Sequence, residues 1–248
     1  MSSVHLLGTG GAVADRHRTT TMLAFTDAAS TFLVDCGGDT VHRMLSAGIN
    51  PDTVFALVIT HTHPDHISGF PLLMEKLWLH GRRRPLPVYG IQEVIDLAQH
   101  LWEAFEMAGW KDFPKIDWHV IPHERDAMVF ANHTWKVTAS PGVHSIPVIG
   151  LRIESRTSGQ AAVYSCDTEP CDAITALAKG AEILLHEANG AGPGHSSADQ
   201  AAQIAADAGV RELVLVHLSA GINERSLDSA LQIFRSTRLG VELGEYNF

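Results

Sequence analysis

Three histidines and an aspartate stand within six consecutive positions, in the segment HTHPDH at residues 61–66. The segment follows the apolar run FALVIT, which has the length and composition of a buried strand. A loop at the end of such a strand can turn the rings of His61 and His63 toward one point, and the side chains of Asp65 and His66 toward a second point nearby. Neutral imidazole and carboxylate groups suit Zn²⁺, Mn²⁺ or iron. The segment therefore predicts a metal site.

Four further side chains that can bind metals or transfer protons occur later in the chain. They stand in the segments PGVHSIP, YSCDT, PGHSS and LVLVHLS, and are His144, Asp167, His195 and His217. Each lies at the end of an expected strand or in a loop beside one, and ligand sites form where strands of α/β sheets end. A polar loop without a metal gives no reason for these partners, so the metal interpretation rests on several segments together.

Short apolar strands alternate with amphipathic helices along the chain. The patterns predict strands at 4–7, 22–25, 31–35, 55–60, 135–140, 148–155, 161–167, 182–188 and 212–217. They predict helices at about 40–47, 91–108, 173–179 and 198–208, with a last helix marked by Leu227, Ala230, Leu231 and Phe234. Ser197 is the expected N-cap of the 198–208 helix, with Gln200 three residues later as in a capping box. No linker, low-complexity tract or repeat interrupts the pattern, so we expect one α/β domain over residues 1–248.

Composition restricts the class of partner. The formal net charge is −10 over 248 residues, so the chain has no general attraction to polyanions. The one basic run, Arg82-Arg83-Arg84, is interpreted as a solvent-exposed turn. The three cysteines are odd in number and form no CxxC pair, which favours a reducing compartment. Without a signal sequence or an apolar stretch long enough to span a bilayer, we expect a cytoplasmic protein with no membrane partner.

The glycines Gly8, Gly10 and Gly11 suggest a nucleotide-binding loop, with Asp35 as its acidic partner. The dinucleotide fingerprint, however, requires a third glycine where Val13 stands, followed directly by a helix. A P-loop requires Lys-Ser or Lys-Thr after its last glycine, and neither pair follows. We therefore expect a tight turn whose backbone passes close to another segment.

Taken in order, these motifs resemble the metallo-β-lactamase fold superfamily and, within it, ribonuclease Z and its short relatives. The similarity runs almost end to end and is carried by the segments LLGTGGAVADRHRTTTMLAF, FLVDCGGDTVHRMLSAG, VITHTHPDHISGFPLLM, YSCDTEP, LLHEANG, GHSSADQAAQIA and LVLVHLS. The resemblance implies an α/β fold in the form of an αββα sandwich. It also implies a site along one edge, where loops from both sheets meet.

The resemblance further implies a ligand set for two divalent metal ions, most simply Zn²⁺, with Mn²⁺ or iron as alternatives. The first set is His61, His63 and His144, the second is Asp65, His66 and His217, and Asp167 bridges the two. Two ions about 3.5–4 Å apart clamp the attacking and leaving oxygens of an in-line displacement and lower the pKa of bridging water to about 7. The bridging water, once deprotonated, is then the expected nucleophile, and Asp65 is placed to accept the proton that the water loses.

Three residues beside the implied ligands have roles that the sequence leaves open. His195 matches a family segment in which a proton donor to the leaving oxygen is expected, and otherwise it is a loop histidine that caps nearby structure. Glu187 either orients His195 or has a structural role. Cys166 stands where relatives usually have glycine, and is either a soft extra ligand or a small packing residue.

The chain lacks the segment with which ribonuclease Z binds tRNA, and this bears on the expected size of its substrate. Ribonuclease Z carries a long basic arm between its third histidine and the bridging aspartate, and uses the arm to grip tRNA. Here only residues 145–166 lie between these two positions, and two strands and their turn account for all of them. We therefore expect a dinuclear metal-dependent phosphodiesterase that acts on a small or short phosphodiester, and we do not expect extended nucleic acid as a partner.

Three alternatives remain open at the level of sequence. The same site can hydrolyse esters, lactones, thioesters or lactams, because the same nucleophile attacks carbonyl carbon. The chain can also be a tRNA 3′-processing endonuclease, or a non-catalytic metal-binding protein. Relatives are commonly homodimers, and the segment FPLLMEKLWL at 70–79 is either a dimer contact or an ordinary buried helix.

Overall fold

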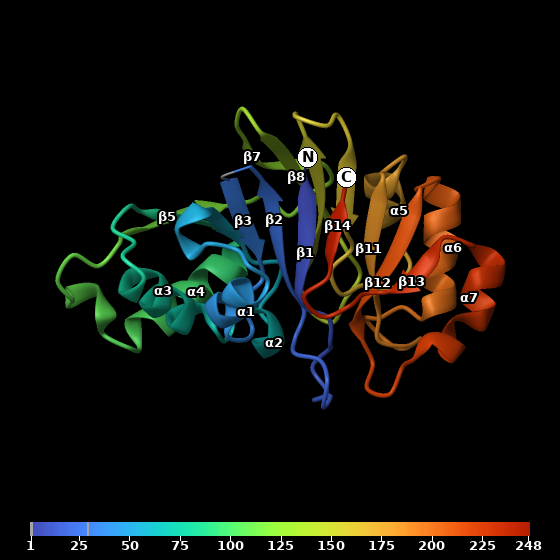
Figure 1. Cartoon of the computed structure of the whole chain (residues 1–248), viewed down its shortest axis with the longest axis horizontal. Helices are drawn as coiled ribbons and strands as arrows, with labels where there is room; N and C mark the ends of the chain where they lie inside the picture. Colours follow the sequence, from blue (N-terminus) through green and yellow to red (C-terminus); the bar gives the residue numbers. More distant parts are fainter. Residues whose placement is uncertain (1, 29) are drawn as a thin grey trace.

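The computed structural model describes residues 2–28 and 30–248. Two seven-stranded sheets face each other at the centre of the molecule (Figure 1). The first sheet has the order β14-β1-β2-β3-β4-β5-β6. Its strands are β1 (Ser3–Gly8), β2 (Met22–Asp27), β3 (Ser30–Val34), β4 (Val54–Val58), β5 (Leu86–Gly90), β6 (Ile116–Val120) and β14 (Glu245–Asn247). The strands from β14 to β3 pair antiparallel, and those from β3 to β6 pair parallel.

The second sheet has the order β13-β12-β11-β10-β9-β8-β7. Its strands are β7 (Ala127–Ala131), β8 (Trp135–Pro141), β9 (Ile149–Ser155), β10 (Ala161–Tyr164), β11 (Ile183–Ala188), β12 (Glu212–Leu218) and β13 (Thr237–Leu239). The strands from β7 to β10 pair antiparallel, and those from β10 to β13 pair parallel. Each sheet thus combines a meander with a parallel half, and parallel halves need helical crossovers on an outer face.

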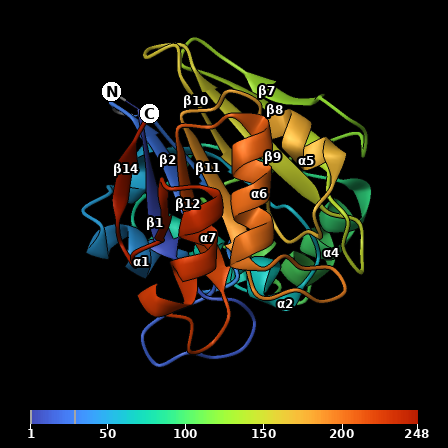
Figure 2. The same cartoon turned by 90° about the vertical axis from the view of Figure 1, so that its right-hand side faces the viewer.

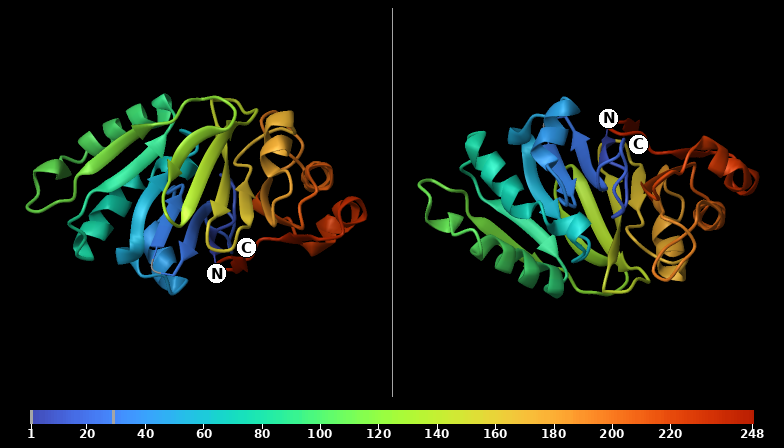
Figure 3. Two further views of the ribbon diagram at one scale, coloured as in Figure 1. Left: turned by 90° about the horizontal axis from the view of Figure 1, so that it is seen from above. Right: turned by 90° about the horizontal axis from the view of Figure 1, so that it is seen from below.

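Helices cover the outer face of each sheet. Those on the first sheet are α1 (Thr40–Ser46), α3 (Phe70–Leu79) and α4 (Gln92–Glu103), and those on the second are α5 (Asp172–Ala178), α6 (Ala198–Ala208) and α7 (Asp228–Ile233). Figure 2 shows the second helical layer from outside, and Figure 3 shows the four layers from above and below. The short helix α2 (Pro64–Ile67) lies below the label of α1 in Figure 1, toward the lower edge of the sandwich. The expected αββα sandwich is confirmed.

The described residues also form three short 3-10 helices, η1 (Pro51–Thr53), η2 (Met107–Gly109) and η3 (Glu224–Leu227). Within the two described stretches of chain, no helix combines the length and the apolar character needed to cross a membrane.

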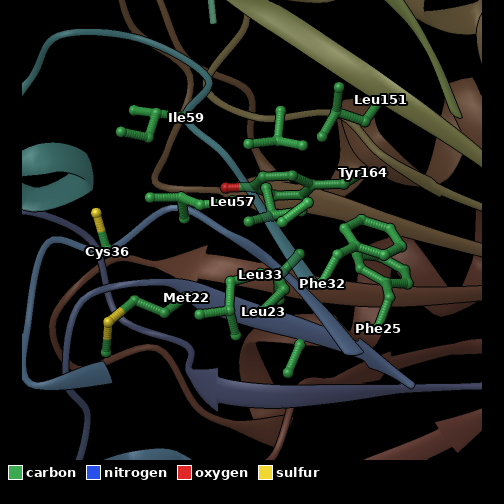
Figure 4. Packing of buried hydrophobic residues seen from close by; sticks show 14 of the residues in the cluster. Met22, Leu23, Phe25, Phe32, Leu33, Cys36, Leu57, Ile59, Leu151 and Tyr164 are labelled. Atoms are coloured by element: carbon green, nitrogen blue, oxygen red, sulfur yellow. The ribbon is translucent and has the colours of Figure 1, made fainter. Parts of the chain in front are cut away.

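The inner faces of the two sheets share one core of apolar side chains (Figure 4). Phe32 has no exposure to solvent; its ring stacks on Phe25 with centroids 5.0 Å apart and meets Trp135 of the opposite sheet edge-on at 5.5 Å. Fully burying such a side chain contributes about 1.5–3 kcal/mol. A second apolar cluster lies beneath α5, α6 and α7. The shared core holds the two sheets, and therefore the loops at their ends, in fixed relation.

Local signals explain where several elements end. Ser197 caps α6 with the predicted capping box, accepting from the backbone N–H of Gln200 while the Gln200 side chain accepts from the N–H of Ser197. The predicted helix at 91–108, in contrast, is too long, because α4 ends at Glu103. Its apolar pattern continues through Phe105, but that side chain is 61% exposed and offers no buried face to extend the helix.

Some strands lie outside the sequence prediction. The residues of β6 are partly or fully exposed, and those of β5 alternate between buried and half-buried and include a proline, so neither has the continuous apolar run of a buried strand. The predicted strand at 161–167 is too long, since β10 ends at Tyr164 and the next three residues turn into the site.

The interpretation of the basic run as a solvent-exposed turn is wrong for Arg82. Its side chain is only 3% exposed, and its guanidinium donates to the carbonyl oxygens of Val54, at 2.6 Å, and Pro85. Arg83 and Arg84 are exposed, as predicted. Arg82 is thus a structural residue that ties the loop before β5 to the start of β4.

Candidate metal centre

Polar side chains from both sheets meet at one edge of the sandwich. His61 follows β4 of the first sheet, whereas His144 follows β8 and Asp167 follows β10 of the second. His217 lies near the end of β12, and the short helix α2 carries Asp65 and His66. This edge is at the bottom of Figure 1, where α2 is labelled. The structure therefore brings together all seven residues that the sequence proposed as metal ligands.

Three residues at this edge have left-handed backbone torsion angles. φ is +61° for Asp35, +54° for Cys166 and +46° for His217. Such values are uncommon for residues other than glycine, and each costs of order 1–3 kcal/mol. They persist only where the surrounding contacts hold them, and they gather at functional sites. Strain at three strand ends thus marks the same edge as the histidines do.

The first group of ligands converges on one point. The Nδ1 atom of His63 lies 3.2 Å from Nε2 of His61 and 3.1 Å from Nε2 of His144. Oδ2 of Asp167 is 3.9 Å from Nε2 of His61 and 4.0 Å from Nε2 of His144. One atom from each of these four residues lies within 4.8 Å of every other. This is the first ligand set implied by the resemblance, with the aspartate beside it.

The second group lies on the other side of the same aspartate. Oδ2 of Asp65 is 3.6 Å from Nε2 of His66 and 3.3 Å from Nε2 of His217. Asp167 reaches this group as well, with Oδ1 at 3.6 Å from Nε2 of His66 and Oδ2 at 3.3 Å from Nε2 of His217. Asp167 is therefore in reach of both groups, which is the placement that a bridging carboxylate needs.

The donor atoms fit divalent metal ions. Zn–N bonds of about 2.0–2.1 Å in a tetrahedral site place ligand nitrogens about 3.3 Å apart, close to the spacing of the His61, His63 and His144 nitrogens. Nε2 of His66 and Oδ1 of Asp167 are buried and have no hydrogen-bond partner among the described residues. Orphaned buried polar atoms are costly unless a ligand satisfies them. The two atoms lie 3.6 Å from each other.

The pKa shifts of three proposed ligands also bear on metal binding. Burial, reinforced by the nearby His66, lowers the pKa of His61 far below its usual value. Burial opposes ionisation of Asp167, but His217 and His66 hold the pKa of this carboxyl well below its usual range. A neutral imidazole and an ionised carboxylate are the forms that bind metal ions. His61 and Asp167 are therefore in forms that bind metal ions. Burial opposes protonation of His66, but Asp167 and Asp35 raise its pKa well above the usual value, so this imidazole must lose a proton to act as a ligand.

His195 lies beside the two groups and is held by Glu187. Its Nδ1 is 3.0 Å from Oε1 of Glu187, and its ring stacks near that of His217 with centroids 5.7 Å apart. Glu187 is fully buried and also accepts from the backbone N–H groups of Thr168, Ser196 and Asn189. Glu187 therefore contacts His195 and also holds the surrounding loops through their backbone N–H groups. The same side chain is thus placed both to orient His195 and to stabilise local structure.

Cys166 is buried behind the first group. Its Sγ lies 2.9 Å from Oγ1 of Thr60 and 3.5 Å from Nδ1 of His61. Nδ1 is the ring nitrogen that points away from the convergence point, where Nε2 lies. Burial raises the pKa of the Cys166 thiol well above its usual value. Since metals bind the thiolate, this position favours hydrogen bonding over ligation.

Sequence reasoning missed Asp35 and Thr60. Oδ2 of Asp35 is 2.8 Å from Nδ1 of His66, and both Asp35 oxygens accept from the Thr60 hydroxyl at 3.0 Å. Asp35 attracted notice only as the partner of a nucleotide-binding loop. Its position directly after the buried strand β3 was the available signal, since Asp167 also stands shortly after a buried strand, β10.

The glycine turn near the N-terminus is the predicted close approach. A Cβ atom at Gly8 would lie 2.0 Å from the carbonyl oxygen of Thr20, and one at Gly11 would lie 3.2 Å from Cε1 of His217. The turn therefore lies against His217 at one wall of the metal centre; a side chain at Gly8 would clash with backbone, and one at Gly11 would crowd the imidazole.

Comparison with known proteins agrees with this geometry. The family model described as "Beta-lactamase superfamily domain" matches residues 30–218. Ribonuclease Z of Methanothermobacter thermautotrophicus is 31% identical, and the match covers 98% of this chain and 95% of that protein. The chain therefore belongs to the metallo-β-lactamase fold superfamily and, within it, to the ribonuclease Z family.

Two solved structures show the same fold. Human tRNase Z, short form, superposes with a TM-score of 0.81 at 21% identity, covering 99% of this chain and 98% of that one. A structure titled as a diphosphatase from the PhnP family superposes with a TM-score of 0.79 at 19% identity, covering 100% and 98%. At these identities the likeness extends to the fold alone.

Proposed function

We propose that this chain is a dinuclear metal-dependent phosphodiesterase of the ribonuclease Z type that acts on a small or short phosphodiester. The observation that carries the proposal is the position of Asp167, which is within 4.0 Å of a histidine nitrogen from each ligand group. A carboxylate placed in this way serves two-metal hydrolysis, in which paired ions clamp a phosphoryl group. The ribonuclease Z relative supports the phosphodiester class.

The proposed ligands are those named above. His61, His63 and His144 would hold one ion, Asp65, His66 and His217 the other, and Asp167 both. When bound, divalent ions supply electrostatic stabilisation of the phosphoryl oxygens and make water an effective nucleophile at neutral pH. Nitrogen-rich sets with a carboxylate suit Zn²⁺ best, and Mn²⁺ or iron are the alternatives.

Asp65 is proposed to accept a proton from the attacking water. Burial raises the pKa of this carboxyl, but its hydrogen bond to His217 and the charge of His66 outweigh burial and lower it below the usual value. Asp65 is therefore ionised at neutral pH. Its side chain is 12% exposed, so it borders both the metal centre and solvent. A general base needs this combination of charge and access.

His195 is proposed to donate a proton to the leaving oxygen. Its Nδ1–H donates to Glu187, which leaves Nε2 free to face a substrate. The hydrogen bond to Glu187 raises the pKa of His195, so the imidazole is protonated over more of the neutral range. The side chain is 23% exposed, whereas the proposed ligands His61, His66 and His144 are 2% exposed or less.

The proposed substrate is small because the described segment between His144 and Asp167 contains no arm that could grip tRNA. Residues between His144 and Asp167 form β9, β10 and a short turn that ends at Gly159. The net charge of −10 also opposes binding to an extended phosphate backbone. Precursor tRNA processing and the hydrolysis of carbonyl compounds remain the alternatives against which the substrate must be tested.

Three further properties of the chain are proposed: a homodimer contact, a cytoplasmic location and a single hydrolase domain. Leu72 and Leu79 stand one heptad apart on α3 and are 38% and 66% exposed, which supports a homodimer contact on this helix. The cysteines Cys36, Cys166 and Cys171 are all free, which supports a cytoplasmic location. We also propose that residues 1–248 act as one hydrolase domain, since the shared core spans both sheets.

A substrate panel tests the proposal. Purified protein reconstituted with Zn²⁺ or Mn²⁺ is assayed with bis(p-nitrophenyl) phosphate, p-nitrophenyl phosphate, a lactone, a lactam and a precursor tRNA. We expect chelator-sensitive cleavage of the phosphodiester and poor processing of the tRNA. Position-specific cleavage of precursor tRNA at physiological salt would overturn the proposed substrate size, and turnover of only the lactone or lactam would overturn the reaction class.

A further inference from the structure

The hydroxyl group of Thr60 sits at the centre of a buried hydrogen-bond network behind the metal centre. Its Oγ1 lies 3.0 Å from both carboxylate oxygens of Asp35, 3.1 Å from Nδ1 of His61 and 2.9 Å from Sγ of Cys166. All four side chains are 1% exposed or less. Because water is excluded, each donor and acceptor here depends on its protein partner.

One arrangement of protons uses the shortest contacts of this network and gives the Thr60 hydroxyl a partner for its hydrogen and for both lone pairs. An ionised carboxylate accepts and cannot donate, so the Thr60 hydroxyl donates its hydrogen to Asp35. Its oxygen can then accept two hydrogen bonds, and the two remaining neighbours are Nδ1 of His61 and the thiol of Cys166. In this arrangement the imidazole carries its proton on Nδ1 and donates to Thr60 at 3.1 Å, and the longer contact of 3.5 Å between Nδ1 and Sγ of Cys166 is not used. Nε2 of His61, the atom that faces His63 and Asp167, is left with a free lone pair.

The same carboxylate acts on the second ligand group without an intermediary. Nδ1 of His66 donates to Oδ2 of Asp35 at 2.8 Å, which leaves Nε2 of His66 facing Asp65 and Asp167. Asp35 also accepts from the backbone N–H of Thr60 at 2.8 Å, and this fixes the start of the loop that carries the histidines. One side chain from each ligand group is thus oriented from a single point.

We propose that Asp35 and Thr60 form one positioning unit for both ligand groups, with Asp35 orienting His66 directly and His61 through the Thr60 hydroxyl. Cys166 occupies the second acceptor position of that hydroxyl and keeps it closed to water. The inference rests on the proposed metal-dependent function and adds residues that lie behind the ligands. Partners that donate or accept at the outer nitrogen of a ligand histidine fix its tautomer and ring orientation.

The proposal predicts different effects on metal binding for substitutions at Thr60 and at Asp35. Removal of the Thr60 hydroxyl should weaken only the ion held by His61, whereas removal of the Asp35 charge should weaken both ions. A purely structural role for either residue would instead lower stability without separating the two binding steps. Thr60→Val keeps the shape of the side chain without its hydroxyl, and Thr60→Ser keeps the hydroxyl.

The first measurement is made on metal-free protein. Long-range ¹H–¹⁵N spectra of histidine rings report which nitrogen carries the proton, and the His61 signals are assigned by their loss in His61→Asn. We expect an Nδ1-protonated His61 in the wild type and in Thr60→Ser, and a mixture of tautomers in Thr60→Val. Retention of the pure Nδ1-protonated form in Thr60→Val would overturn the proposal. This result does not depend on whether the protein is a phosphodiesterase.

The second measurement is a calorimetric titration with Zn²⁺. We expect Thr60→Val to lose about 10–100-fold in affinity at the step that His61→Asn abolishes, with the other step unchanged, and Thr60→Ser to bind like the wild type. Asp35→Asn should weaken both steps. The matched control is Thr40→Val, because the Thr40 hydroxyl is buried against Sδ of Met22 and lies outside the network.

Two results would contradict the inference at this stage. Equal weakening in Thr60→Val and Thr40→Val would show a general effect of losing a buried hydroxyl, and unchanged affinity in Thr60→Val would show that the hydroxyl does not act on His61. Should Asp35→Asn fail to fold, the Thr60 pair still decides the question. A wild-type protein that binds no metal ion would defeat the proposed function, while the tautomer measurement would still decide the role of Thr60.

Discussion

Nδ1 of His195 lies 3.0 Å from Oε1 of Glu187, a carboxylate with no exposure to solvent. A buried carboxylate in this position holds the imidazole in one orientation and favours its charged form. The pair is outside the seven proposed ligands, so its contribution can be separated from metal binding.

Removal of the His195 imidazole should therefore affect chemistry and leave the metal ions in place. For His195→Ala we expect unchanged metal content and a loss of roughly 10²–10⁴ in kcat with a phosphodiester that has an alkoxide leaving group. The loss should be small for bis(p-nitrophenyl) phosphate, because p-nitrophenolate departs without a proton. Equal losses for the two leaving groups would reduce the role of His195 to placement, and loss of an ion would make it a ligand.

The pH dependence of the same reaction tests the role of Glu187. The hydrogen bond from Glu187 raises the pKa of His195, so a His195 that acts as an acid is active below this pKa and inactive above it. Activity on the alkoxide substrate should fall as pH rises through the raised pKa. In Glu187→Gln this alkaline limb should move to lower pH. A limb that stays in place would show that another group limits the reaction at high pH.

Metal stoichiometry tests the ligand sets. Wild-type protein purified without chelator should contain close to two transition-metal ions per chain by elemental analysis. His66→Ala should lose mainly one ion and Asp167→Ala both, because Asp167 lies within 4.0 Å of histidine nitrogens in both groups. His100→Ala, at an exposed position on α4, is the matched control. A wild-type content near zero after reconstitution would contradict a dinuclear centre.

The buried guanidinium of Arg82 gives a prediction about stability. Arg82→Ala leaves the carbonyl oxygens of Val54 and Pro85 without this donor, at a cost of about 1–3 kcal/mol in the free energy of unfolding. Arg83→Ala removes an exposed neighbour and should change it by less than about 0.5 kcal/mol. Chemical denaturation of both variants measures the difference. Similar losses of unfolding free energy in Arg82→Ala and Arg83→Ala would mean that the buried hydrogen bonds of Arg82 make no net contribution to stability.

The meeting of the seven proposed ligands at one edge was predictable from local spacing and strand ends, and the resemblance supplied their division into two groups. The spacing of His61, His63, Asp65 and His66 places four donors in one turn of chain after a buried strand, and the strand ends identify the other members. The αββα layers followed from the same strand pattern together with the resemblance. The periodicity of apolar residues was sufficient to predict an element where that element has one buried face, as α6 does.

The remaining features depend on contacts between distant segments. Asp35 acquires its role because β3 and β4 are parallel neighbours, which brings its carboxylate to Thr60 and His66. Arg82 is buried because it lies against Val54, and no local pattern indicates that contact. The end of α4 was also not predictable, because its apolar spacing continues past the point where a packing partner exists.

The division of the metal centre between the two sheets has a kinetic consequence. His61 belongs to the first sheet and His144, Asp167 and His217 to the second, so neither half of the chain can assemble the site alone. Contacts between segments this far apart require the closure of long loops and form slowly. The site is therefore completed only when the first sheet packs against the second. A metal ion bound by ligands from both sheets opposes the separation of the sheets at this interface, here called the seam. Chelation should accelerate the opening of this seam before it alters the secondary structure of either half.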